Sequence, residues 1–228
     1  MENSTNGHVV SEEDKKFIFD YLNKLYSANT ETISEVYSGF ASVYDKANAI
    51  LKYEPFKGLA KDLAVFFEHK NLENKKILDV GCGSGNLGKS LVKEGFKNID
   101  GLDMSDKFLE MAEETKCYGK LFKVLFTSNP TPGIKDNSYD VAISAGCYLA
   151  CHLPMDTIFE LARIVKPGGY IHYTVSDPND KMDFMYWQGK LMKEKKAELI
   201  YMKKEPYRLE PTKNFEEVHC YYVMFKVL

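Results

Sequence analysis

The most informative segment of the chain is Lys75-Lys76-Ile77-Leu78-Asp79-Val80-Gly81-Cys82-Gly83-Ser84-Gly85-Asn86-Leu87. Its apolar part, residues 77–80, is short, ends abruptly and is followed by glycines, which predicts a buried parallel β-strand. The glycines at 81, 83 and 85 allow a tight turn and let the backbone approach a ligand closely. We expect Asn86 to cap a helix that runs to about Glu94 and whose first N–H groups face that ligand.

A second signal lies about 20 residues beyond the glycines. Residues 98–102 are predicted to form the next strand, which ends at Asp103. An acid at this distance can bind the paired hydroxyls of a ribose. A dinucleotide fingerprint would need G-x-G-x-x-G, but position 86 is Asn. Together the signals indicate an adenosine-type ligand on a Rossmann-like sheet and argue against NAD.

The segments ILDVGCGSG (residues 77–85) and GLDMSDKFLEMA (residues 101–112) resemble the first two motifs of the class I S-adenosylmethionine-dependent methyltransferases. The resemblance extends from about Tyr37 to Asp177 and includes the sequence KPGG at residues 166–169. It implies an α/β fold, a Rossmann-like three-layer sandwich with a seven-stranded, mostly parallel sheet and an antiparallel C-terminal hairpin. N-terminal helices would cover the site of the cofactor, S-adenosyl-L-methionine, whose product is S-adenosyl-L-homocysteine.

One part of the chain resembles a particular branch of this family. Residues 146–149 read Gly-Cys-Tyr-Leu, Pro154 follows, and a Tyr-Asp pair lies upstream at Tyr44-Asp45. This combination is most similar to the Williams–Beuren-region methyltransferase-like proteins. The resemblance implies a small, stand-alone enzyme whose methyl acceptor is unknown.

Length and composition set the broad class of the protein. The 228 residues suit one α/β domain. We expect a disordered tail at residues 1–10 and a single domain at 11–228, with a helical cap at 11–70 and a Rossmann-like core at 75–228. A net charge of −3 gives no strong signal for nucleic-acid binding. The oligomeric state does not follow from the sequence.

The sequence shows no recognisable targeting signal, and together with the cysteine usage this leads us to expect a cytoplasmic protein. No apolar run reaches the roughly 20 residues that span a bilayer, so we expect no membrane partner. Residues 1–14 are polar and acidic, unlike a signal or transit peptide. The five scattered cysteines fit reduced thiols. Cys147, Cys151 and His152 lack a second paired cluster, so we expect no metal site.

The other elements are expected in the family's order. Helices are predicted at residues 11–25, 30–50, 55–69, 107–115 and 155–165, and a helical face at 180–199. Strands are predicted at 121–126, 139–144, 170–175, 200–207 and 219–227. We interpret KPGG as the turn into the strand at 170–175, with a geometric role.

The cofactor-binding candidates surround the glycines. Asp79 would attract the ammonium group of the methionine tail, and the amides of the glycine turn would take its carboxylate. The resemblance implies that Asp103 holds the ribose and that Met104 packs on the adenine. The acid that the family often places after the third strand is missing, so Ser128, Asn129 or backbone groups would take its place. The full set is Tyr44, Asp79, Gly81, Cys82, Gly83, Asn86, Asp103, Met104, Ser128 and Ser144.

Candidates for the acceptor pocket come from three places. Residues 37–45 resemble the Y-x-x-x-A-x-x-Y-D segment that folds over the cofactor in this family, so Tyr37 and Tyr44 are candidates; packing within a helix remains the alternative. Tyr148 follows the fourth strand, at the sheet edge where ligands bind. Trp187 belongs to an apolar stripe that forms either a substrate wall or core.

These residues support transfer of a sulfonium methyl group to a small-molecule acceptor. His152 is the candidate base, with a structural position as the alternative, because its pKa range lies near neutrality. His172 is expected to be packed within a strand. A protein that binds the cofactor as an adaptor or sensor remains possible, as does a protein acceptor. An NAD-dependent oxidoreductase is disfavoured by Asn86, which stands where the dinucleotide fingerprint would place a glycine.

Overall fold

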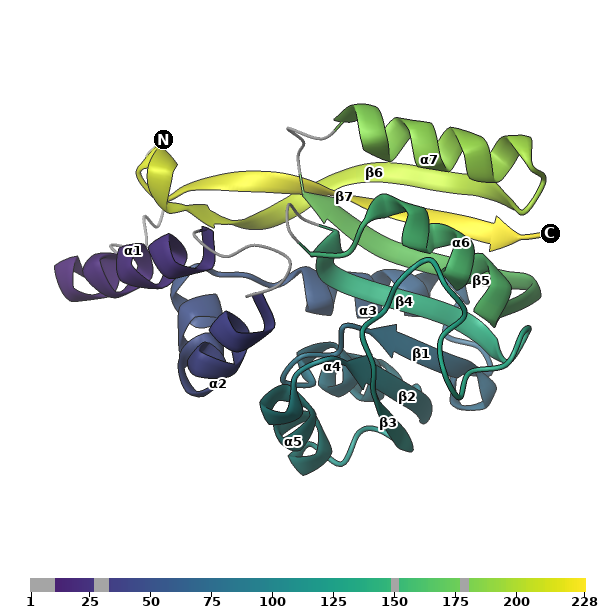
Figure 1. Cartoon of the computed structure of the whole chain (residues 1–228), viewed down its shortest axis with the longest axis horizontal. Coiled ribbons are helices and arrows are strands. Elements are labelled where there is room, and N and C mark those ends of the chain that lie inside the picture. The colour runs from purple at the N-terminus through teal and green to yellow at the C-terminus, as the bar shows by residue number, and fades with distance from the viewer. Residues whose placement is uncertain (1–10, 27–32, 149–151, 177–180) are drawn as a thin grey trace, which may run out of the picture.

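The structure is a computed structural model, and it describes residues 11–26, 33–148, 152–176 and 181–228. The expected tail at residues 1–10 lies outside this range. A seven-stranded sheet with the order β3-β2-β1-β4-β5-β7-β6 organises the chain (Figure 1). The strands are β1 (Lys76–Val80), β2 (Asn98–Asp103), β3 (Lys120–Lys123), β4 (Tyr139–Tyr148), β5 (Val165–Ser176), β6 (Ala197–Glu210) and β7 (Glu216–Val227). Strands β1 to β5 are parallel, whereas β7 runs antiparallel to β5 and β6, which confirms the expected fold class.

Helices cover both faces of the sheet. The α-helices are α1 (Glu12–Tyr26), α2 (Ile33–Ile50), α3 (Pro55–Phe66), α4 (Asn86–Glu94), α5 (Asp106–Glu114), α6 (Ile158–Ile164) and α7 (Lys181–Lys193). Short 3-10 helices lie at Leu72–Asn74, Met155–Thr157 and Pro211–Lys213. One apolar cluster packs α3 and α4 on the sheet, and another packs α6 and α7 on the opposite face. In the described part of the chain, no helix is long and apolar enough to cross a membrane.

A third apolar cluster joins the two N-terminal helices. Ile18 and Leu22 of α1 are buried against Ala47 of α2 and against Leu51, which directly follows α2. The helical spacing of apolar residues in the sequence predicted this face of α1 correctly. Figure 1 shows both helices beside the end of the sheet, apart from the helices that cover its faces.

The C-terminal strands and β5 are longer than the sequence pattern predicted. Strands β6 and β7 pair over 12 positions, because partners on the neighbouring strand favour an extended backbone where local alternation is weak. KPGG lies inside β5 rather than before it. Val165 pairs with Tyr139 and Tyr170 with Val141, so residues 166–169 form an irregular excursion of the strand. A Cβ at Gly169 would lie 2.6 Å from the carbonyl oxygen of Asp140, which explains the glycine.

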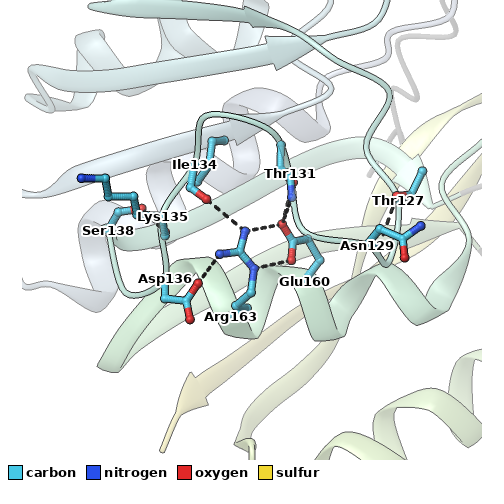
Figure 2. Close-up of polar contacts among 9 residues, drawn as sticks. All are labelled: Thr127, Asn129, Thr131, Ile134, Lys135, Asp136, Ser138, Glu160 and Arg163. Atoms are coloured by element: carbon cyan, nitrogen blue, oxygen red, sulfur yellow. Dashed lines mark hydrogen bonds and ion pairs between the residues drawn. The ribbon is translucent and has the colours of Figure 1, made fainter.

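Strand β3 ends earlier than predicted, and a long loop without a helix connects it to β4. The carboxylate of Glu160 on α6, only 2% exposed, accepts hydrogen bonds from the backbone N–H of Thr131 at 2.7 Å and from its hydroxyl at 2.6 Å (Figure 2). Arg163 binds the same carboxylate through two nitrogens, each at 2.6 Å, and also contacts Asp136 and the carbonyl of Ile134. One buried carboxylate and one guanidinium therefore fix the loop to α6.

Substitutions of Glu160 and Asp136 should show that the buried partner of Arg163 contributes more to stability than the exposed one. Glu160→Ala leaves Arg163 and the amide of Thr131 without their buried partner, so the free energy of unfolding should fall by about 3–5 kcal/mol. Asp136→Ala removes only the exposed partner of Arg163 and should cost at most about 1 kcal/mol. Urea denaturation of both variants measures this difference. Equal losses would contradict the assignment of Glu160 as the anchor.

Candidate functional site

The glycine turn is fixed at the carboxyl ends of β1 and β2. The N–H groups of Gly81 and Cys82 both donate to the carbonyl oxygen of Leu102, at 2.9 and 3.0 Å. Gly81, Gly83 and Gly85 have φ values of +72°, +51° and +82°, which other residues rarely adopt. The turn therefore depends on its glycines and lies beside the end of β2.

Asp103 is held by two backbone amides. Its carboxylate accepts from the N–H of Gly83 at 3.0 Å and from the N–H of Ser105 at 2.9 Å. Burial raises the pKa of Asp103, and these amide bonds oppose the rise. The side chain is still partly exposed. A fixed and accessible carboxylate at this place is suited to accept hydrogen bonds from a ligand.

Asp79 is a buried carboxyl group with an unused oxygen. Its Oδ2 accepts from the Tyr118 hydroxyl at 2.8 Å, whereas its Oδ1 is buried and has no hydrogen-bond partner among the described residues. Burial raises the pKa of Asp79 to about 7, and the nearby charge of Asp103 adds to the effect. A buried carboxylate oxygen without a partner is costly. A cationic group of a ligand would satisfy it.

Helix α2 contacts the glycine turn through Asp45. Its Oδ1 accepts from the Ser84 hydroxyl at 2.9 Å and from the Asn86 side-chain amide at 2.8 Å. The prediction that Asn86 caps α4 is wrong in detail, because Gly85 occupies the cap position and the Asn86 side chain binds α2 instead. Sequence reasoning noted the Tyr44-Asp45 pair but assigned no role to Asp45.

The sequence analysis gave Cys147 no role in binding the cofactor and did not name Tyr53. A Cβ at Gly81 would clash with the Cys147 sulfur, and one at Gly146, whose φ is +74°, would clash with the Tyr53 hydroxyl. Cys147 therefore lies beside the glycine turn, and Tyr53 lies beside Gly146 near the end of β4. Their packing partners are distant in sequence, so no local pattern pointed to them; the glycines at 81 and 146 were the only available signal.

This cluster is protonated at neutral pH. Burial raises the pKa of Tyr44 to about 12 and that of Cys147 to about 12, and it raises the pKa of Tyr53 well above its usual value. The ring of Tyr44 packs edge-on against Phe108 of α5, with centroids 5.1 Å apart. These groups can donate hydrogen bonds but are poor bases at neutral pH.

Two predicted residues of β4 are involved in the packing of the sheet. Ser144 is fully buried and donates to the carbonyl of Val80 at 2.8 Å, which ties β4 to β1. Tyr148 is 3% exposed, its hydroxyl lies 3.1 Å from that of Thr157, and its ring packs on Tyr173. It belongs to the apolar cluster on the α6 side of the sheet, so the structure gives Tyr148 a core position.

The remaining candidates are spread around the site. Trp187 packs between α7 and α6, edge-on to Phe159, with centroids 6.1 Å apart. Ser128 is exposed in the loop after β3, Met104 and His152 are partly exposed, and Cys82 is buried. The side chain of Tyr37 lies outside the described residues, as does Cys151.

His172 is packed within a strand, as the sequence predicted. It is fully buried in β5, with its Nε2 3.2 Å from the Asp62 carboxylate. Asp62 also accepts from Tyr201 and Lys203. Among the described residues, no group of three or more His, Cys, Asp or Glu side chains is arranged to hold a metal ion.

Comparisons with known proteins place this site in context. Residues 78–173 match the family model described as a methyltransferase domain. The ubiquinone biosynthesis O-methyltransferase of Vibrio parahaemolyticus is 34% identical over 112 residues, which are 48% of this chain and 47% of that protein. The enzyme of the same name from Hydrogenovibrio crunogenus is 30% identical over 116 residues, 50% of this chain and 48% of that protein. The chain thus spans about half the length of the curated relatives it matches.

Solved structures show the same fold. A SAM dependent methyltransferase from Aquifex aeolicus superposes with a TM-score of 0.52 at 18% identity, covering 84% of this chain and 98% of that one. At this identity the likeness shows the fold alone. The seven-stranded sheet with its antiparallel C-terminal strands is therefore the fold of the class I methyltransferases.

The raised pKa of Asp79 predicts a pH-dependent cost of folding. Between about pH 4 and pH 7 the native state binds the proton that the unfolded state has lost, so stability falls as pH rises through this window. Asp79→Asn should therefore raise the free energy of unfolding of the cofactor-free protein at pH 8, by at most about 4 kcal/mol, and should have little effect near pH 4. Urea denaturation at both pH values measures the gain.

A matched control for this prediction is Asp136→Asn, because Asp136 lies on the surface. Its free energy of unfolding relative to that of the wild type should differ little between the two pH values. A loss of stability in Asp79→Asn at pH 8 would mean that the carboxylate is satisfied by a contact that the structure does not show.

Proposed function

We propose that this protein, which carries a methyltransferase-domain match over residues 78–173 in a class I fold, is an S-adenosylmethionine-dependent methyltransferase acting on a small-molecule acceptor. One observation carries the proposal: the Gly83 amide and the Asp103 carboxylate meet at 3.0 Å, beside the buried and unsatisfied oxygen of Asp79. An adenosine ligand with an amino-acid tail would use each of these groups.

The residues fit this cofactor part by part. The ammonium group would satisfy the Oδ1 of Asp79. The amides of Gly81, Cys82, Gly83 and Gly85 already donate within the chain, so the carboxylate of the methionine tail would bind the remaining amides of the turn and of the first turn of α4. The ribose hydroxyls would donate to Asp103. Met104 and Ser128 would face the adenine, and Tyr44 would close the site from α2. Gly81, Cys82, Gly83 and Asn86 would shape the turn, whereas Ser144 would act through the packing of β4 against β1.

The chain would promote transfer mainly by orientation and by excluding water. When bound, the cofactor supplies a methyl group that is already activated on a sulfonium. Alignment of the acceptor can contribute up to roughly 7–11 kcal/mol. The raised pKa values keep Tyr44, Tyr53 and Cys147 protonated, so these residues would position the acceptor by hydrogen bonds. His152 remains the candidate base that removes a proton from the acceptor. Tyr37 and Trp187 remain candidates for lining the acceptor pocket.

The acceptor is proposed only at the level of its chemistry. The curated relatives are named for O-methylation in ubiquinone biosynthesis. The residues that match the methyltransferase-domain model, 78–173, contain the glycine turn and Asp103. We therefore place a hydroxyl of a small organic molecule first among acceptors. The resemblance to the Williams–Beuren-region methyltransferase-like proteins is compatible with an acceptor of this kind, and we propose a cytoplasmic location.

A second function is favoured by one observation. Burial raises the pKa of Tyr53 and of Cys147, so neither of these two described side chains near the end of β4 is a base at neutral pH. A protein that binds the cofactor or its product as an adaptor or sensor would need only the binding half of the site. Methylation of a metabolite extract by the purified protein would distinguish an enzyme from a sensor.

Calorimetric titration of the purified chain tests the proposal directly. S-Adenosylmethionine and S-adenosylhomocysteine should each bind with micromolar affinity and a stoichiometry of one. Failure of both ligands to bind would contradict the methyltransferase and the sensor together.

Substitution of Asp103 should weaken this binding. Asp103→Ala removes a charge-assisted acceptor from the ribose and should cost about 1–3 kcal/mol in affinity for S-adenosylhomocysteine. Asp106→Ala is the control, because Asp106 lies three residues away, is exposed and pairs with Lys123. It should bind like the wild type, and an equal loss in both variants would remove Asp103 from the site.

A further inference from the structure

Large apolar side chains are exposed together on one border of the molecule. Of the eleven such residues in the described part of the chain, six belong to α7 and β6 and are 38–60% exposed. We call them the edge patch: Met185, Tyr186 and Met192 on α7, and Leu199, Ile200 and Met202 on β6. Scattered exposed apolar residues need no explanation, but a cluster of this kind does.

The geometry of α7 places its two exposed methionines on one flank. The helix buries Phe184 and Leu191 against the sheet. At 100° per residue, Met185 and Met192 lie on the same flank, about a quarter turn from that buried face. Figure 1 shows α7 lying along β6, the outermost strand of the sheet. The helix thus has a second apolar face at the sheet edge, which covering the sheet does not require.

The same segment carries a positive charge that the rest of the chain lacks. Residues 181–204 contain seven lysines and three acids, a formal charge of +4, which leaves −7 for the remainder of the chain. Lys193, Lys195, Lys196 and Lys204 are exposed, and none of the four forms an ion pair with a described residue. The partner of this border should therefore be anionic.

The shape of the border excludes two common partners. A bulge interrupts the β6 register near Ile200, and Pro206 lacks an N–H, so β6 is poorly suited to pair with another strand. A partner helix would need a groove. The edge patch instead lies on the outer flank of a helix and on the last strand, which suits a flat surface.

We propose that the edge patch docks the protein on an anionic lipid membrane. Methionine, tyrosine and isoleucine side chains would enter the interfacial region, while the lysines would contact lipid headgroups. The absence of an apolar run long enough to span a bilayer does not bear on this kind of binding, which needs only a surface. The inference is independent of the proposed methyl transfer.

The chain contains its own probe for this interaction. Trp187 is its single tryptophan and lies on α7 beside Tyr186, with ring centroids 5.1 Å apart. The full-length protein is mixed with phosphatidylcholine vesicles, either pure or containing 30% phosphatidylglycerol, and binding is measured by cosedimentation and by Trp187 fluorescence. Binding to the anionic vesicles with a blue shift, weakened by 0.5 M NaCl and by omission of the anionic lipid, is the expected result.

Two variants assign the binding to the patch. Met185→Glu/Met192→Glu should weaken vesicle binding at least tenfold, and Lys195→Gln/Lys196→Gln by about fivefold for each lysine. Val92→Glu is the control, because Val92 is equally exposed on α4 but far from α7 in the fold, and it should bind like the wild type. Circular dichroism of each variant confirms that it is folded.

Three results would overturn the proposal. The first is no binding of the wild type to anionic vesicles at millimolar lipid. The second is binding that the folded Met185→Glu/Met192→Glu variant retains in full. The third is a wild-type dimer in light scattering that this variant abolishes without any vesicle binding, which would assign the patch to a second copy of the chain.

Discussion

The carbonyl oxygen of Leu102 accepts two hydrogen bonds, from the amides of Gly81 and Cys82, and the candidate site depends on this one arrangement. It closes the turn after β1 onto the end of β2 and thereby brings Asp79 and Asp103, which end neighbouring strands, to the same place. The positive φ angles of the glycines follow from this closure. Because the contacts are made by backbone groups, side chains of the turn remain available for α2 on one side and for a ligand on the other.

This arrangement concentrates unfavourable electrostatics where a ligand would bind. Asp79 and Asp103 are both buried enough for their pKa values to rise, and the charge of Asp103 adds to the cost of charging Asp79. The protein therefore keeps two carboxyl groups close together without a cation among the described residues to balance them. Sites that are strained in the absence of ligand are common where binding is the function. The carboxylate of Glu160 differs from these two, because it is buried but has hydrogen-bond partners within the chain, Thr131 and Arg163.

The predictable parts of the structure are those encoded within a few residues. The strand, the glycine turn and α4 are contiguous, so periodicity and glycine spacing located them. Ser105 caps α5 by a similarly local contact, in which its side chain accepts from the amide of Phe108. The contact between Thr131 and Glu160 could not be predicted, because the two residues are 29 positions apart and no local sequence pattern marks either of them. The position of Tyr53 beside Gly146 joins residues about 90 apart in the chain, and the true lengths of β6 and β7 depend on their mutual pairing.

The contact between Asp45 and the glycine turn divides the site into two layers of different stability. Asp45 is exposed and holds α2 to Ser84 and Asn86 by side-chain bonds, whereas the turn itself is held to Leu102 by backbone bonds inside the sheet. Local opening releases weakly buried elements long before the sheet unfolds. Amide hydrogens of α2 should therefore exchange with solvent through local opening of this helix, while the amide hydrogens of Gly81 and Cys82 stay protected. The molecule can thus uncover its glycine turn repeatedly while the turn keeps its shape.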